Sequence, residues 1–215
     1  MVNFPHMNKK LKIPFIKSRG FECGQACAAM VIKHYRPNFE PDFELMNQII
    51  RHKPGKYSFP PQQAILLDYY GINAKCFSND GVNTSTEEPG QFKRWYGKDY
   101  ESQMRFIDIA SFDWMVETMR KKQLFEKKTT SFEEIIELFK QNKVVYFPID
   151  WKTLNNKAGT YEGHFVILSG IEGEQVLIHD PDVGPFIKYA RKDLQRAWEH
   201  PVITDDLIVA YGENE

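Results

Sequence analysis

Apolar residues in the first two thirds of the chain recur every three or four positions, which is the spacing of an amphipathic helix. This pattern predicts helices over residues 23–35, 42–52 and 111–125, and another that begins after Pro60-Pro61 and stops at Gly71. Proline suits the first turn of a helix, and glycine suits the position beyond its last turn. Ser131 and Glu134 form a capping-box pattern, which predicts a further helix running through residue 142.

The pattern changes after residue 142. Short β-branched and aromatic runs, separated by Gly, Asn and Asp, predict strands over residues 143–149, 164–171, 175–179 and 186–189. Two extended segments precede them, at residues 11–16 and 72–77. Helices followed by strands indicate an α+β fold in a single domain over residues 1–215, in which a helical half (about 18–142) packs on an antiparallel sheet half (about 143–211).

Residues 78–104 interrupt this organisation, because their composition is polar and rich in glycine. We expect an insertion or a long ordered loop here. Trp95, Tyr96 and Tyr100 lie within it. Aromatic side chains in such a segment either line a substrate cleft or fix the segment to the core, and both interpretations stay open.

The composition excludes several classes of protein. A hydrophobic content of 42% over 215 residues is enough to build a core, and 28 basic against 29 acidic residues leave no field that would attract a nucleic acid. No apolar run approaches the roughly 18 residues of a membrane-spanning helix. Residues 1–10 lack the apolar core of a secretory signal, and three cysteines are too few for a disulfide framework. We therefore expect a cytoplasmic protein with no membrane segment and no nucleic-acid partner.

The sharpest local feature is Cys23, which lies at the turn into the first apolar helix. A thiol at a helix N-terminus faces unpaired backbone N–H groups and the positive end of the helix dipole, which favour the nucleophilic thiolate. Gly24 leaves the approach to the sulfur open. The alternative is that Cys23 is a small buried residue, as we expect for Cys27 one turn later in the apolar stretch.

Two further polar residues flank predicted strands. His164 follows a Gly-rich turn at the start of one strand, and Asp180 ends the next strand before Pro181. Antiparallel pairing of these strands would bring the carboxylate near the imidazole, where it can fix the tautomer and stabilise the imidazolium. Taken alone, each residue is more typical of an ordinary structure: a histidine at a strand start is usually structural, and Asp before Pro is common in turns. Together with Cys23 they have the composition of a thiol nucleophile, its base and an orienting group.

These motifs resemble those of a known family. The run Glu22-Cys23-Gly24, followed by apolar residues 26–30, resembles the Asp/Glu-Cys-Gly nucleophile motif of the bacteriocin-processing, double-glycine-leader cysteine peptidases and their papain-like relatives. Gly163-His164-Phe165-Val166 and Asp180-Pro181 are similar to the His and Asp motifs of that family, in the same order and with similar spacing. The resemblance covers the first helix and the last third of the chain, and leaves residues 39–142 largely unmatched.

The resemblance implies a papain-like cysteine peptidase fold, with the nucleophile helix of the N-terminal half packed on the C-terminal antiparallel sheet. It implies that Cys23 is the nucleophile, His164 the general base and acid, and Asp180 the orienting carboxylate. The family also has an oxyanion-hole glutamine about six residues before the nucleophile. Here that position holds Lys17, or Ser18 in a shifted register, while the nearest glutamine, Gln25, follows the cysteine. We expect Lys17 or Ser18 as the alternative oxyanion donor, beside the backbone N–H of Cys23.

Metal sites are weaker alternatives. Cys23 and Cys27 share a helix face and could bind zinc with His164 or His179, but structural zinc sites use more closely spaced cysteines on turns. Asp180 and Asp182 with Asp150 could bind a hard cation, but acidic turns are common and no calcium-loop spacing follows. We therefore expect neither a metal nor a cofactor. Trp151, directly after a predicted strand, would flank the cleft in the family architecture.

Three functions follow from these residues. The first is a cysteine peptidase or amide hydrolase with a peptide or protein substrate. The second is an acyltransferase or transamidase, which forms the same acyl-enzyme and passes the acyl group to an amine or thiol. The third is a catalytically weak peptide-binding domain, which the absence of the glutamine favours and the presence of Cys23, His164 and Asp180 opposes.

Overall fold

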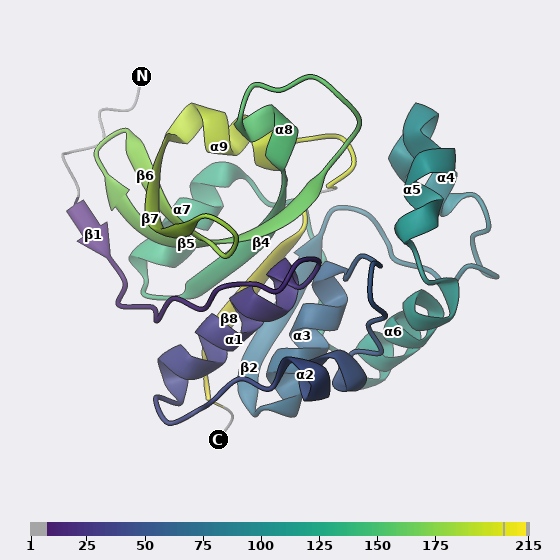
Figure 1. The fold of residues 1–215 in the computed structure, drawn as a ribbon, viewed down its shortest axis with the longest axis horizontal. Helices are drawn as coiled ribbons and strands as arrows, with labels where there is room; N and C mark the ends of the chain where they lie inside the picture. The colour runs from purple at the N-terminus through teal and green to yellow at the C-terminus, as the bar shows by residue number, and fades with distance from the viewer. Residues whose placement is uncertain (1–7, 204, 214–215) are drawn as a thin grey trace.

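A mixed sheet runs through the centre of the molecule (Figure 1). The computed structural model describes residues 8–203 and 205–213, and within these residues eight strands form one sheet in the order β3-β2-β8-β4-β5-β6-β7, with β1 paired to β5. Among the described strands only β2 and β3 pair in parallel. The strands are β1 (Asn8–Lys10), β2 (Ile72–Ser78), β3 (Phe125–Lys127), β4 (Val144–Asp150), β5 (Gly163–Glu172), β6 (Gln175–Asp180), β7 (Gly184–Ala190) and β8 (Leu207–Glu213).

Helices cover both faces of this sheet (Figure 1). They are α1 (Cys23–Tyr35), α2 (Phe43–Ile49), α3 (Pro60–Tyr69), α4 (Gln91–Tyr96), α5 (Tyr100–Gln103), α6 (Ile109–Lys122), α7 (Phe132–Lys140), α8 (Trp151–Leu154) and α9 (Arg191–Trp198), with short 3-10 turns η1 (Gly97–Asp99) and η2 (Met104–Phe106). No helix among the described residues is long and apolar enough to cross a membrane.

Alternating side chains of the central strands divide the core into two layers. In β4, Val144 and Tyr146 pack in the cluster that contains α1, α2 and α3, whereas Val145 and Phe147 pack in the cluster that contains α7 and α9. This alternation is the two-residue period of a strand, and here both faces are buried. The sheet is therefore the middle layer of three, which confirms the predicted α+β fold.

Most predicted elements are found, with small shifts at their ends. The helix predicted over residues 23–35 is α1, and Ser131 caps α7 by accepting a hydrogen bond from the Glu134 backbone N–H at 3.2 Å. The segment at residues 11–16 is not a strand; β1 precedes it. Strand β8, which was not predicted, lies between β2 and β4, so that strands from both halves of the sequence share one sheet. Residues 1–7 of the N-terminal segment lie outside the described residues.

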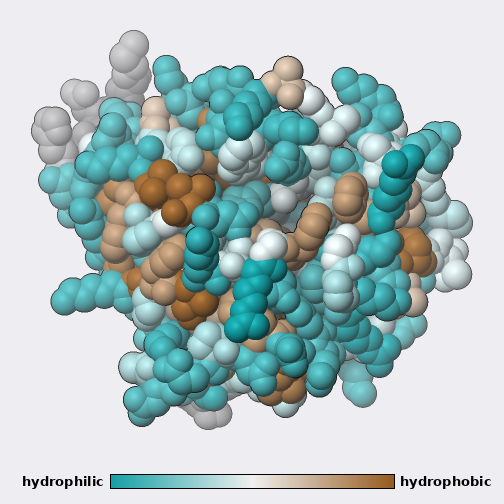
Figure 2. Space-filling view, in the orientation of Figure 1, coloured by the Kyte–Doolittle hydropathy of each residue, from teal (hydrophilic) through white to brown (hydrophobic). Residues whose placement is uncertain are grey.

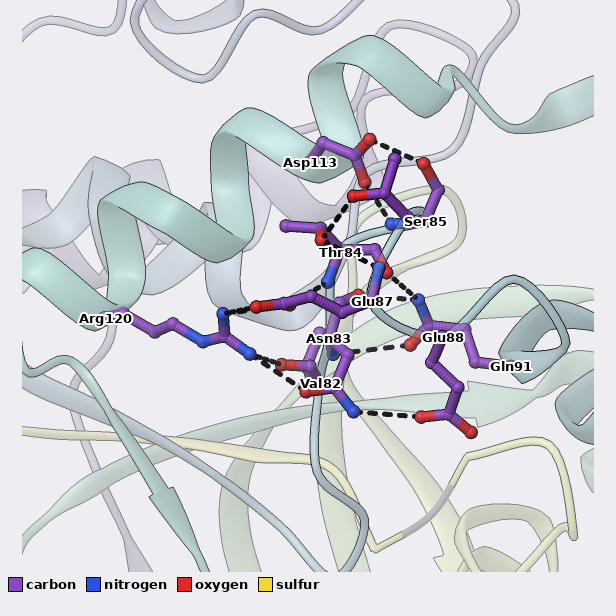
Figure 3. Close-up of polar contacts among 10 residues, drawn as sticks. Val82, Asn83, Thr84, Ser85, Glu87, Glu88, Gln91, Asp113 and Arg120 are labelled. Carbon is purple, nitrogen blue, oxygen red and sulfur yellow. Dashed lines mark hydrogen bonds and ion pairs between the residues drawn. The ribbon is translucent and has the colours of Figure 1, made fainter.

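Residues 78–104, expected as an insertion or a long loop, contain an irregular stretch followed by α4, η1 and α5. Polar contacts fix the irregular stretch to α6 (Figure 3). Asp113 accepts hydrogen bonds from the Ser85 backbone N–H and hydroxyl, both at 2.6 Å. Arg120 donates to both Glu87 carboxylate oxygens at 2.8 and 2.9 Å and to Asn83 Oδ1 at 2.9 Å. Polar contacts with α6 thus hold this segment in place.

The outer surface is mainly polar on the face shown in Figure 2. Hydrophobic side chains on this face form small separate patches, one of them over β6 and β7 (Figure 2). Few large apolar side chains among the described residues are strongly exposed, and two of them, Phe21 and Val183, line the cavity described below.

Candidate active site

Cys23 is the first residue of α1 and is half-buried. Glu22 precedes it at the N-cap position, but its side chain does not cap the helix. The Glu22 carboxylate instead accepts a hydrogen bond from Asn47 Nδ2 at 2.6 Å, and Asn47 Oδ1 accepts one from Gln25 Nε2 at 2.8 Å. This chain of contacts fixes the first turn of α1 to the end of α2, and it leaves the helix N-terminus at Cys23 without a competing carboxylate cap.

Gly24 lies where α3 packs against the first turn of α1. A Cβ atom at this position would lie 2.7 Å from Gln63 Nε2 and 2.9 Å from Ser58 Oγ. A side chain here would force Gln63 and Ser58 to shift, because α3 and the segment before it approach the first turn of α1 closely. The side chain of Gln63 is fully buried, and neither of its polar atoms has a hydrogen-bond partner among the described residues.

His164 lies at the start of β5 and is 6% exposed. Its Nε2 is 2.8 Å from Asp180 Oδ1, and the ring also contacts the Cys23 side chain. Burial lowers the pKa of His164, but hydrogen bonds to Asp180 and Cys23 and the negative charges of both groups outweigh burial and raise the pKa to about 10. Because Nε2 is engaged by Asp180, Nδ1 is the ring nitrogen that remains for Cys23.

Asp180 ends β6 and is completely buried. Burial raises the pKa of its carboxyl group, but the hydrogen bond and charge of His164 and two backbone N–H groups lower it below the ordinary value. These N–H groups belong to Asp182 and Val183 and donate to Oδ1 at 2.9 and 3.2 Å. The β6–β7 turn therefore holds an ionised carboxylate against the imidazole, across the antiparallel pairing of β5 with β6.

The two expected oxyanion donors lie elsewhere. Lys17 is exposed, and the half-buried Ser18 donates its hydroxyl hydrogen bond to the Asp182 carboxylate and its backbone N–H to Pro181 O at 2.9 Å. Neither residue lines the cavity beside Cys23. Gln25 is fully buried, and its amide contacts Asn47 and Ser58. The contacts of Ser18 fix the N-terminal segment to the β6–β7 turn.

The candidate metal ligands have structural partners. His179 is buried, which lowers its pKa, and its Nε2 lies 3.0 Å from Ile13 O while its Nδ1 accepts from the Phe186 N–H at 3.1 Å. Asp150 caps α8 by accepting from the Thr153 N–H at 3.0 Å. Cys27 is fully buried, and burial raises its pKa. Within residues 8–203 and 205–213, no group of three His, Cys, Asp or Glu side chains could hold a metal ion.

A cavity of about 610 Å³ opens beside Cys23 and His164. Trp95, Tyr96 and Trp151 line it. Trp95 and Tyr96 also pack in the hydrophobic cluster of α3, α4 and α6, so both alternatives expected for these rings apply, whereas Tyr100 packs against that cluster without lining the cavity. The sequence did not predict the other lining residues, among them Tyr57, Gln103, Phe106, Phe112 and Tyr161. They come from segments far apart in the chain, and no local motif marks them.

Comparisons with known proteins agree with this architecture. The sequence model of the Peptidase_C39 like family matches residues 1–201. The chain is similar to a solved structure described as a C39-like peptidase from Bacillus anthracis, with 16% identity and a TM-score of 0.56, covering 97% of this chain and 100% of that chain. It is also similar to the peptidase domain of Streptococcus ComA, a bi-functional ABC transporter involved in a quorum sensing pathway, with 12% identity, a TM-score of 0.51, and 94% and 100% coverage.

A third structure is a double glycine motif protease from an AMS/PCAT transporter in complex with the leader peptide, with 18% identity, a TM-score of 0.49, and coverage of 95% of this chain and 98% of that chain. No curated protein sequence matches significantly. The family match and the first two structures confirm the fold that the sequence motifs implied.

Proposed function

Because the chain belongs to the Peptidase_C39 like family, we propose that it is a cysteine peptidase that hydrolyses an amide bond of a peptide through Cys23, His164 and Asp180. Support comes from the placement of one ring. The imidazole of His164 lies between a buried carboxylate and the side chain at the N-terminus of α1, at the mouth of a large cavity. These are the relative positions that a thiol nucleophile, its acid and base, and an orienting group require.

In the first half of the reaction, the Cys23 thiolate attacks the carbonyl carbon of the substrate. A bond forms between Sγ and carbon, and the π electrons of the carbonyl move onto its oxygen. The backbone N–H of Cys23 at the start of α1 stabilises this oxyanion. His164 then gives the Nδ1 proton to the leaving nitrogen as the C–N bond breaks, which releases an amine and leaves a thioester on Cys23.

In the second half, water attacks the thioester. His164 takes a proton from the water as the new C–O bond forms, and the C–S bond then breaks to release a carboxylic acid and the thiolate, so that the imidazolium is restored. Asp180 keeps the ring in one orientation and stabilises its positive charge throughout. The raised pKa of His164 fits a resting state in which the ring carries the proton that the leaving amine needs.

The first test is the rate at which iodoacetamide alkylates Cys23, measured by peptide mass spectrometry between pH 5 and 10. We expect Cys23 at pH 6 to react at least tenfold faster than glutathione in the same buffer, and to lose this advantage in His164→Ala, because the imidazolium stabilises the thiolate. Cys27 and Cys76, both buried, serve as internal controls in the same digest. Equal rates for Cys23 in the two proteins would refute the proposal.

Hydrolysis itself is tested on a mixed peptide pool by mass spectrometry of the new termini. Wild type is expected to cut a subset of the peptides, and Cys23→Ala to cut none. Cys27→Ala is the matched control, because it removes a thiol one helical turn below and keeps the nucleophile. Cleavage by Cys23→Ala at the wild-type rate would exclude Cys23 as the nucleophile.

A further inference from the structure

Strand β7 is irregular where it passes the end of β6 beside the candidate active site. The pairing of the two strands shifts at this point, so that His179 of β6 alone faces both Pro185 and Phe186 of β7. Two residues against one is the arrangement of a β-bulge. Pro185 has no N–H group, and Phe186 has a φ of 53°, which a bulky residue rarely adopts. Phe186 therefore depends on a contact from outside the strand ladder.

The buried ring of His179 supplies this contact. The Phe186 N–H donates to Nδ1 at 3.1 Å, so Nδ1 carries no proton and the proton of the neutral ring is on Nε2. Nε2 then donates to Ile13 O at 3.0 Å. The rings of Phe15 and Phe186 pack edge-on against the imidazole, with centroids 6.0 and 4.5 Å away. One side chain of β6 thus joins β7 to the segment before α1.

This segment is a strap, residues 11–18, that runs along the sheet from β1 toward α1 (Figure 1). The N–H of its first residue donates to Ser169 O of β5 at 3.0 Å, and the N–H of its last residue donates to Pro181 O at 2.9 Å. Between these points the contact with His179 holds it. The strap ends five residues before Cys23. Of these three contacts, only the one with His179 involves a side chain that titrates near neutral pH.

His179 also lies next to the carboxylate that orients His164. Asp180 directly follows it on β6, and Asp180 Oδ1 accepts from two backbone N–H groups of the turn that leads into the bulge. The nucleophile and its partner thus depend on two segments, the strap before Cys23 and the bulged turn around Asp180, and His179 contacts both. A misplacement of reacting groups by about 1 Å can lower a rate about 100-fold.

Protonation of His179 would break these contacts. A proton on Nδ1 would face the Phe186 N–H, so that two donors oppose each other, and a positive charge would be buried. Burial lowers the pKa of His179 and outweighs backbone contacts with Ile13 and Ile178, which raise it. Because the pKa in the folded state is below the ordinary value of 6.5, the neutral ring stabilises the fold fully above pH 6.5. This stabilisation is lost as the pH falls through the lower pKa.

Charged neighbours do not control this ring. Within residues 8–203 and 205–213 His179 has no ion pair. The titratable or charged groups next to its contacts on the strap, β5, β6, β7 and the covering helix α1 are Lys12, His164, Asp180, Lys188, Tyr189 and Cys27. Lys10 contacts the Phe186 ring at 5.8 Å and pairs with Glu172 at 2.8 Å. The pKa of His179 therefore follows from its burial and its backbone contacts.

We propose that His179 is a positioning residue for Cys23 and His164, whose neutral ring holds the strap and the bulge where this pair requires them and releases both on taking up a proton. The inference rests on the proposed function, since it concerns the conditions in which the same site works. Protonation of His179 sets the acid limit of activity, and loss of the His164 proton sets the alkaline limit. Activity then follows a bell-shaped dependence on pH.

The first measurement uses the unaltered protein. NMR titration of the imidazole C–H signals between pH 4 and 8 gives the pKa of His179, and iodoacetamide alkylation of Cys23 is followed in the same buffers. Below this pKa we expect the Phe186 amide to be at least tenfold less protected from hydrogen exchange, and the alkylation rate to fall with the same midpoint. Unchanged protection of this amide would overturn the inference, as would a His179 ring that stays neutral down to pH 4.

Variants of His179 separate its position from its protonation. The amide oxygen of His179→Asn can accept from the Phe186 N–H in place of Nδ1, but it does not titrate. We expect this variant to keep the Cys23 rate at pH 7 within about threefold of wild type, and the ratio of its rates at pH 7 and pH 4 to be at least threefold smaller. His179→Leu, which leaves both backbone partners unpaired, should lower the rate at pH 7 at least tenfold.

His34→Asn is the matched control. The His34 ring is half-buried, and its Nδ1 lies 3.2 Å from Lys12 O of the same strap, but it has no contact with the bulge. We expect the wild-type pH profile of Cys23 alkylation in this variant. The same ratio of rates at pH 7 and pH 4 in wild type and His179→Asn would contradict the inference.

Failure of the proposed function would give a different result. Equal Cys23 rates in wild type and His164→Ala at pH 7 would remove the catalytic pair, whereas protection of the Phe186 amide would still report whether His179 holds the bulge. Strong dependence of the rate on His164, with a pH profile that His179→Asn leaves unchanged, would refute the positioning role of His179 alone.

Discussion

The charge on His164 depends on its neighbours more than on its own burial. Burial alone would favour the neutral ring, but Asp180 and Cys23 stabilise the imidazolium and raise the pKa to about 10. A histidine whose pKa is higher in the folded state than its ordinary value of 6.5 stabilises the fold fully below pH 6.5. This stabilisation is lost as the pH rises from 6.5 through about 10. Alkaline pH therefore lowers the free energy of unfolding and removes the positive charge of the His164 ring over the same pH range.

Replacement of Asp180 with asparagine tests this dependence directly. Asp180→Asn keeps an oxygen that accepts from the His164 ring and the backbone N–H groups, but it removes the charge, so the pKa of His164 is expected to fall by at least one unit. The measurement is an NMR titration of the imidazole C–H signals between pH 5 and 11.

Asp182→Asn is the matched control for this titration. The Asp182 carboxylate lies 3.8 Å from His164 Nδ1 and is half-exposed, so water screens its charge. We expect a smaller decrease in the pKa of His164 in this variant. An equal or larger decrease would show that the buried carboxylate does not control the ring.

At this scale, residues with a local motif were predictable and residues without one were not. Cys23, His164 and Asp180 each lie at the boundary of a predicted element, and the structure brings His164 into contact with the other two. Their catalytic roles stay a prediction. The distance of Lys17 from Cys23 in sequence predicts an oxyanion donor, but the neighbouring Ser18 contacts Pro181 and Asp182 and the Lys17 side chain is exposed. Gln103 lines the cavity only because segments far apart in the sequence pack together.

At the level of elements, the approach of α3 to α1 decides which residue can follow Cys23. Gly24→Ala is expected to lower the free energy of unfolding by about 1–3 kcal/mol, because the new methyl group would overlap the Gln63 amide. Urea unfolding measures the change.

The double variant Gly24→Ala with Gln63→Ala tests whether steric overlap with the Gln63 amide causes the loss of stability. Removal of the Gln63 amide makes room for the methyl group, so the second substitution should restore part of the lost stability. Strictly additive effects of the two substitutions would mean that the amide does not oppose a side chain at position 24.

The contacts between the irregular stretch after β2 and α6 are expected to hold one wall of the cavity in position. Hydrogen bonds from Arg120 and from Thr84 lower the pKa of Glu87 to about 2, so the carboxylate is ionised at neutral pH and keeps its contact with Arg120. Arg120→Ala is therefore expected to speed backbone hydrogen exchange at Thr84 and Ser85 at least tenfold, with β4 and β5 unchanged. Hydrogen-exchange mass spectrometry measures both regions.

Glu117→Ala is the control for the exchange measurement, because Glu117 is an exposed residue of the same helix. We expect wild-type exchange in this variant. If Arg120→Ala also leaves the exchange of Thr84 and Ser85 unchanged, other contacts hold the segment. The two contacts of Asp113 with Ser85, both at 2.6 Å, would then be tested next.

Local signals explain which elements were predictable. The cap at Ser131 and the prolines at residues 60 and 61 act within one helical turn. The helix α7 begins directly after the cap, and α3 begins at Pro60 itself, two residues before the predicted start. Strand β8 has a short apolar run that is buried on both faces, because Leu207 and Val209 pack in one layer while Ile208 and Ala210 pack in the other. Such a run lacks the polar alternation that identifies a half-buried strand.

For the whole molecule, β8 is the strand that joins two parts of the sequence. It pairs with β2 on one side and with β4 on the other. Ile208→Asp is therefore expected to unfold the whole sheet, with a loss of about 4 kcal/mol or more, because an unpaired charge would be buried between the sheet and the layer of α1, α2 and α3. Urea unfolding followed by circular dichroism provides the measurement.

Lys75→Gln is the matched control for this experiment. Lys75 lies on the neighbouring strand, opposite Val209, and its side chain is 46% exposed. We expect a change of less than about 0.5 kcal/mol in this variant. A fold that tolerates Ile208→Asp equally well would show that the two parts are stable without β8.

The central place of β8 also has a consequence for biosynthesis. Ribosomes make a chain from its N-terminus at about 5–20 residues per second, so Leu207 follows Cys23 by roughly 10–40 s. During this interval the nascent chain carries the thiol but lacks the strand that completes the sheet between β2 and β4. If Cys23 is the nucleophile, a nascent chain cannot cleave neighbouring polypeptides until β8 has been synthesised and the sheet is complete. The order of synthesis then delays peptidase activity until late in translation.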